Sequence, residues 1–192
     1  MFLVFPRARL RASVFAIPSM IVMLWLEGLL PFFILMLSAL VHELGHIAAM
    51  RLLGYRARRI DILPMGALIV CPEGISYLHE TVIALSGPIA SLLTSAIAFC
   101  VYAVSREASS LFVAFVNLLL GVFNLMPIEK LDGGKALYCF LSHKNNESCR
   151  RISSAASYAS KAIVIILVSF AVIVSGGNLG AIVLSAALLL QT

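Results

Sequence analysis

Long apolar runs recur along almost the whole of this 192-residue chain and restrict its fold more than any other feature. With 61% hydrophobic and only 12% charged residues, it lacks the surface of a soluble protein, which carries about 25% charged residues. Because a membrane-spanning helix needs about 20 apolar residues, we predict an all-α polytopic membrane protein with about six transmembrane helices. The candidate spans are roughly residues 12–30, 31–53, 81–104, 111–141, 160–175 and 179–191.

The basic residues indicate how such a chain is oriented. If the N-terminus is cytoplasmic, all of the 14 Lys and Arg residues except Arg106 fall on the cytoplasmic side, as the positive-inside rule requires. No small-residue cleavage site follows the first apolar run, so we interpret it as a retained span rather than a signal peptide. The net charge of +5 is not clustered on a polar surface and so does not indicate a nucleic-acid partner. We expect a multi-pass protein of the cell membrane.

The segment RRIDILPMGALIVCPEG, residues 58–74, breaks the helical pattern between the second and third spans. Ile60 and Ile62 alternate with charged residues, and the Pro-Met-Gly at 64–66 predicts a turn. Open-edged backbone at membrane depth is tolerated only against protein or a wet cavity. We therefore expect a small β-hairpin at the cytoplasmic side or lining a cleft. A plain turn with no functional role is the alternative.

Three ionisable residues lie inside the second apolar run, where LSALVHELGHIAAM covers residues 37–50. His42, Glu43 and His46 form the pattern H-E-x-x-H, which on a helix places both imidazoles on one face while the glutamate can act on an attacking water. Each such residue costs on the order of 2.5–3.5 kcal/mol inside a membrane segment. A bound divalent cation would compensate this cost, whereas mutual hydrogen bonding between helices is the simpler alternative.

A catalytic zinc usually takes three protein ligands, so a third must come from elsewhere. His79, His143, Glu73, Glu129, Asp132 and the cysteines are candidates. His42 precedes Arg51 by nine residues, and Asp132 precedes Leu141 by the same number. At 1.5 Å per residue both would lie about 14 Å from the cytoplasmic helix ends. This match in depth favours Asp132.

The segment around Asp132 also predicts unusual backbone. Residues 111–141 would form a helix of about 46 Å, which exceeds a hydrocarbon core of about 30 Å. We expect a break at Asn124-Leu125-Met126-Pro127, and Gly133-Gly134 would let another backbone segment approach closely. Unwound backbone needs water or protein partners, which predicts a wet cavity that leads from the cytoplasm to the metal.

With these two segments, the chain resembles the site-2 protease family, the intramembrane zinc metalloproteases. HELGH at 42–46 and NLMPIEKLDGGK at 124–135 are similar to the family's two signature segments, and LPMG and SGPIASLL to weaker ones between them. The resemblance is closest to the stage IV sporulation protein FB type. It implies a single transmembrane metalloprotease domain, 1–192, without a PDZ or CBS domain.

The resemblance also implies the site. His42, His46 and Asp132 would bind one Zn²⁺ per chain, and Glu43 would be the general base. The expected activity is hydrolysis of a peptide bond, with zinc polarising the scissile carbonyl and Glu43 moving the proton.

Substrate contacts are implied in the same way. Asn124 and Pro127 would belong to a loop that holds the substrate, and the hairpin at 59–71 would offer an edge for strand addition. The substrate would be a membrane-associated protein cut in regulated intramembrane proteolysis. A sigma-factor precursor or an anti-sigma factor, a role in sporulation and a membrane regulatory protein are implied by family analogy alone.

Departures and alternatives accompany this resemblance. Family members often carry Pro where Lys130 stands and Asn where Ser91 stands. A membrane-embedded metal transporter would use the same ligands, but it needs a polar path to the outer face, and outward of His42 the second span has little beyond Ser38. A non-catalytic metal-binding scaffold would not need Glu43.

Overall fold

The computed structural model describes residues 2–5, 10–13, 18, 21, 24–25, 28–63, 66–70, 74–128, 131–142, 155–156, 158–159 and 162. The chain divides into two compact units, Met1–Phe123 and Asn124–Thr192, and each is described by itself. Most of the first predicted span and nearly all of the fifth and sixth lie outside the described residues. The number of spans therefore stays a prediction.

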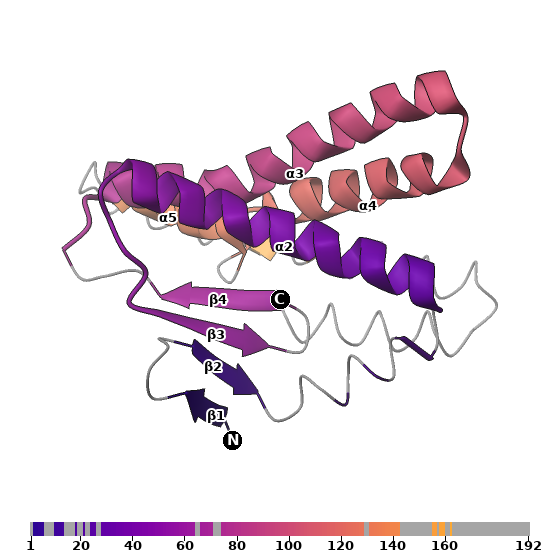
Figure 1. Cartoon of the computed structure of the whole chain (residues 1–192). Helices are drawn as coiled ribbons and strands as arrows, with labels where there is room; N and C mark the ends of the chain where they lie inside the picture. Colours follow the sequence, from indigo (N-terminus) through magenta and orange to yellow (C-terminus); the bar gives the residue numbers. More distant parts are fainter. Residues whose placement is uncertain are drawn as a thin grey trace. The chain divides into compact units, whose positions relative to one another are not determined.

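Two long apolar helices, α2 (Leu29–Leu52) and α3 (Tyr77–Ser105), pack against each other in the first unit (Figure 1). Among the described residues they are the helices long and apolar enough to cross a membrane. They correspond to the predicted second and third spans. Helix α3 begins earlier than predicted because Ser76 caps it: the Ser76 hydroxyl accepts a hydrogen bond from the His79 main-chain N–H at 3.3 Å.

Helices α2 and α3 expose apolar side chains and bury polar ones. Large apolar side chains face outwards, among them Leu37, Leu40, Leu44, Leu93 and Ile97. The buried polar side chains are Ser38, His42, His46, Ser91 and Ser95. A soluble protein shows the opposite arrangement, whereas helices in lipid meet through small and polar residues. The two helices thus have the surface of membrane-embedded elements.

The fourth apolar segment is divided where the sequence predicts it. Helix α4 covers Ala108–Asn124 and helix α5 covers Asp132–Ser142, so the first of them ends ahead of Pro127. Helix α4 runs antiparallel to α3 after a tight connection at Arg106, which has a left-handed φ of 58° (Figure 1). The hydroxyl of Ser95 donates to the carbonyl oxygen of Ala114 at 2.7 Å and links these two helices in the interior.

A four-stranded sheet completes the first unit (Figure 1). Strands β3 (Arg59–Leu63) and β4 (Gly66–Val70) pair antiparallel, with Arg59 opposite Val70. They occupy the residues of the expected hairpin, whose place at the cytoplasmic side of a membrane stays a prediction. Strand β4 contacts α2.

The sheet is larger than the two-stranded hairpin that the sequence predicts. Strands β1 (Phe2–Phe5) and β2 (Leu10–Ser13) pair antiparallel, and β2 pairs with β3 in parallel. The first span therefore cannot begin at residue 12, because β2 continues to Ser13. The alternation of Arg9 and Arg11 with Leu10 and Ala12 is the strand pattern that this prediction overlooked.

In the second unit, the chain from Leu125 folds back on itself before α5 begins. The main-chain N–H of Ile128 donates to the carbonyl oxygen of Met126 at 2.8 Å, and that of Leu131 donates to the carbonyl oxygen of Ile128 at 2.9 Å. A Cβ at Gly133 would overlap the main-chain carbonyl of Leu125. This is the close backbone approach expected at the paired glycines, and it places Asp132 at the first residue of α5.

Candidate metal centre

The site begins with two histidines on the buried face of α2. His42 and His46 are separated by four residues, so they lie one turn apart on one side of the helix. Only 5% and 7% of their surfaces are exposed, respectively. Two buried imidazoles in an apolar helix need partners for all their ring nitrogens, because a buried polar atom without a hydrogen bond is destabilising.

Both imidazoles are anchored through Nδ1 to helix α3. Nδ1 of His46 lies 2.8 Å from the carbonyl oxygen of Ile83. A carbonyl oxygen only accepts, so Nδ1 of His46 must carry the proton and Nε2 of the neutral ring must present a lone pair. Nδ1 of His42 lies 3.0 Å from the hydroxyl oxygen of Ser91. Such outer contacts orient imidazoles that bind metals.

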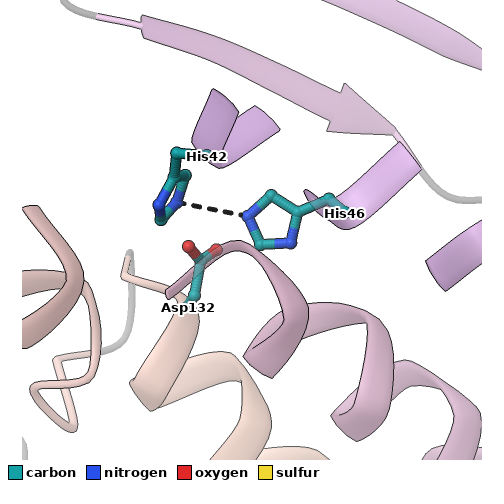
Figure 2. A group of neighbouring side chains, drawn as sticks. All are labelled: His42, His46 and Asp132. Carbon is teal, nitrogen blue, oxygen red and sulfur yellow. Dashed lines mark hydrogen bonds between the residues drawn. The ribbon is translucent and has the colours of Figure 1, made fainter. Parts of the chain in front are cut away.

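The two Nε2 atoms face each other across 3.3 Å (Figure 2). Two lone pairs at this distance repel, so the arrangement requires either a shared proton or a cation that both nitrogens bind. Two Zn–N bonds of about 2.05 Å at a tetrahedral angle place their nitrogens about 3.3 Å apart. The histidine pair therefore fits zinc in donor type, protonation and spacing.

Two glycines give the histidines the room they need. A Cβ at Gly87 on α3 would overlap the imidazole of His46. A Cβ at Gly45 would lie 2.7 Å from the carbonyl oxygen of Ser86 and 2.8 Å from Cβ of Ala90. Both positions lie where α2 meets α3, so side-chain-free backbone on each helix permits their close approach.

Asp132 is the acidic residue of the first turn of α5, and 8% of its surface is exposed. One carboxylate oxygen lies 3.6 Å from the ammonium nitrogen of Lys135. Its carboxylate and the imidazoles of His42 and His46 offer the kinds of donor atom that a divalent cation would need (Figure 2). Asp132 belongs to the second unit, whereas both histidines belong to the first.

The other predicted residues are placed as follows. Glu43 follows His42 in α2 and is half-buried. His79 lies elsewhere, with Nδ1 3.0 Å from the hydroxyl oxygen of Tyr55. Asn124 ends α4, and Pro127 lies in the connection that follows; both are half-buried. The candidates His143, Glu73 and Glu129 lie outside the described residues.

Sequence reasoning missed Ser91 and Gly87 as parts of the site. The signal was present in the chain, because Gly87, Ser91 and Ser95 recur at intervals of four in an otherwise apolar helix. A stripe of small residues on one face marks the side of a membrane helix that meets its neighbours. Only the structure shows that the histidines lie against this stripe.

Comparisons with known proteins show the family of this chain. The sequence model of Peptidase family M50 matches residues 31–109 and 104–168. Zinc metalloprotease Rip3 of Mycobacterium tuberculosis is 32% identical in a match that covers 84% of this chain and 44% of that protein. Stage IV sporulation protein FB of Bacillus subtilis is 33% identical over 56% of this chain and 39% of that protein.

A solved structure shows the same fold. The site-2 protease from Methanocaldococcus jannaschii aligns with all of this chain and 92% of that chain, with a TM-score of 0.64 and 20% identity. The chain thus has the fold of a membrane-embedded site-2 protease, with a candidate metal centre at the paired histidines. It belongs to Peptidase family M50, the site-2 protease family. The chain spans less than half the length of the curated relatives reported above.

Proposed function

We propose that this chain is a zinc-dependent metalloendopeptidase that hydrolyses a peptide bond of a membrane-associated protein. One observation carries the proposal: the Nε2 atoms of His42 and His46, the two histidines of H-E-x-x-H, are buried and lie 3.3 Å apart. The tautomer of His46 is dictated by the Ile83 carbonyl, and the spacing suits a tetrahedral zinc. Family membership supports the same activity.

Asp132 is the third ligand in this proposal. Its carboxylate supplies the hard oxygen donor that completes a His₂-carboxylate set. The equal depths expected from sequence and the resemblance of the LDGG segment support the same assignment. Three protein ligands leave the fourth zinc position open, and the bound zinc would polarise the scissile carbonyl there.

Glu43 is the proton carrier. It directly follows His42, so its carboxylate is rotated about 100° around the helix from the first ligand and is half-buried. In this position it takes a proton from the attacking water and later delivers that proton to the leaving amine nitrogen. A carboxylate is required because Gln at this position could hydrogen-bond to water but could not accept its proton.

Water has to reach this site through apolar surroundings. The described residues between α4 and α5, 125–128 and 131, are non-helical, and unwound backbone at membrane depth is stable only against protein or a wet cavity. We place this connection along a water path from the cytoplasm, with the N-terminus also cytoplasmic. The distribution of Lys and Arg supports this orientation.

The substrate binds as an added strand in this proposal. A helical peptide hides its peptide bonds, so cleavage requires local unwinding, and pairing with a sheet edge stabilises the unwound chain. Strand β4 has β3 as its neighbour and ends the described sheet, and it contacts α2, which carries the histidines. Asn124 and Pro127 contact the bound peptide along the edge that does not pair with β4.

The physiological substrate is the finer part of the proposal. We place it among membrane-associated transcription-factor precursors and anti-sigma factors. Similarity to stage IV sporulation protein FB supports a role in sporulation. A membrane regulatory protein that controls access to the site is part of the same proposal.

The experiment compares membrane proteomes of cells that express wild type, Glu43→Gln or, as a matched control, Glu107→Gln. Glu107 is exposed at the turn between α3 and α4. We expect an uncut precursor to accumulate with Glu43→Gln alone while the purified variant retains zinc. Cleavage that persists in Glu43→Gln would contradict the proposal. Unchanged proteomes together with metal uptake by cells would instead indicate a transporter.

A further inference from the structure

Ser91 lies at the centre of the buried face of α3 and has no exposed surface, at 0%. Its hydroxyl oxygen lies 3.0 Å from Nδ1 of His42. The family often carries Asn at this position, so the resemblance to the family does not explain the role of a serine here. The following inference rests on the proposed function, because it concerns the metal that His42 would bind.

The two histidines differ in what holds them. His46 faces a main-chain carbonyl, which accepts only and so permits a single tautomer. His42 faces a hydroxyl, which both donates and accepts. The fold therefore determines the proton position in His46, whereas in His42 the proton position depends on which way the Ser91 hydroxyl is turned.

A metal at Nε2 requires His42 to carry its proton on Nδ1. In that state Nδ1–H donates to the Ser91 oxygen. When the proton lies instead on Nε2 of His42, it can be donated to the Nε2 lone pair of His46 at 3.3 Å, and the Ser91 hydroxyl then donates to Nδ1. One rotation of the hydroxyl satisfies both states without movement of either ring.

We propose that Ser91 is a positioning residue that holds His42 in its Nδ1-protonated tautomer and thereby sets the metal affinity of the centre. Removal of the hydroxyl takes this acceptor away from the buried Nδ1–H when metal binds, which penalises the bound state selectively. Outer contacts of this kind change metal affinity by about 10–100-fold.

The test measures Zn²⁺ affinity of the full purified chain by competition with a chelator of known affinity. Ser91→Ala should weaken binding about 10–100-fold. Ser95→Ala is the matched control, because Ser95 is buried one turn away on α3 and bonds only to the Ala114 carbonyl among the contacts described. It should lose a buried hydrogen bond but keep wild-type affinity.

A spectroscopic measurement separates positioning from general loosening. In the Co²⁺-loaded protein, each ligating imidazole should give one exchangeable N–H proton resonance. Ser91→Ala should lose or broaden the His42 resonance and keep that of His46, whereas Ser95→Ala should keep both. Ser91→Cys, a similar volume with a poorer acceptor, replaces Ser91→Ala if that variant does not fold.

Wild-type affinity in the Ser91 variant, or an equal loss in Ser95→Ala, would overturn the inference. Failure of the metal assignment would look different, because the wild-type chain itself would then bind no zinc. Failure of the peptidase activity alone would leave the affinities of both serine variants as predicted and would appear as unchanged proteomes in the Glu43→Gln comparison.

Discussion

Nδ1 of His46 and the main-chain carbonyl oxygen of Ile83 lie 2.8 Å apart and connect the C-terminal half of α2 to the first turns of α3. No substitution can remove the carbonyl, so this contact depends on the spacing of the helices. The spacing in turn depends on backbone positions without side chains, Gly45 on α2 and Gly87 on α3. The geometry of the centre is thus a property of the helix interface as much as of the histidines.

Gly87→Ala tests the room around His46. The added methyl would overlap the imidazole, so the ring has to leave its position and we expect zinc affinity to fall about tenfold or more. Gly121→Ala is the control, because its Cβ would press on Cγ of Leu92 at 2.9 Å and on the main-chain oxygen of Pro88 at 3.1 Å and on no histidine. Chelator competition on both variants is the measurement. A Gly87→Ala protein that keeps the zinc affinity of wild type would show that the close approach at Gly87 is unimportant.

Gly45→Ala tests the helix interface. Its methyl would press on the Ser86 carbonyl and on Ala90, and overpacking of this kind costs about 1–3 kcal/mol. Ala48→Leu, on an exposed position of the same helix, should be nearly neutral. Unfolding in detergent by a denaturant series gives the two free energies. A Gly45→Ala protein as stable as wild type would argue against close packing of α2 on α3.

A buried hydrogen bond between α2 and α4 gives a separate prediction. Nδ2 of Asn117 donates to the hydroxyl of Ser38 at 2.8 Å, and Asn117 is 1% exposed. A double-mutant cycle of Asn117→Ala and Ser38→Ala should give a coupling energy of about 0.6 kcal/mol, up to about 1.7 kcal/mol. Zinc affinity should change little in either variant. Strictly additive free energies would contradict a direct bond.

His79 provides a contrast with the two histidines of α2. Its ring contacts Tyr55 rather than the metal group, so His79→Ala should keep one zinc per chain. His42→Ala and His46→Ala should lose zinc, because removal of one ligand leaves a neighbouring buried imidazole without its partner. Elemental analysis of dialysed protein is the readout. Zinc retained in His46→Ala would refute the claim that His42 and His46 bind the metal as a pair.

Sequence reasoning identified the parts of the fold that depend on length and periodicity. The second and third apolar runs are helices, and the fourth divides between Asn124 and Asp132 because Pro127 and the excess length forbid one plain helix. It did not identify β1 and β2, because the pairing of β2 with β3 is a contact between distant segments and the apolar run that follows these strands dominates any local window.

The histidines could be predicted because H-E-x-x-H places its ligands by helical spacing alone. The role of Ser91 could not, because a buried serine is ordinary in a membrane helix and its distance from His42 depends on the packing of α2 on α3. The role of Gly87 could not be predicted either, because its lack of a side chain matters only once the His46 imidazole is known to pack against it.

X-ray absorption at the zinc edge of the purified chain tests the central claim most directly, since it reports the ligand types around the metal. We predict two imidazole nitrogens and oxygen donors at about 2.0–2.2 Å, with no sulfur at about 2.3 Å. A protein that binds no zinc, or a spectrum dominated by sulfur, would contradict the assignment of His42 and His46 as the metal-binding pair.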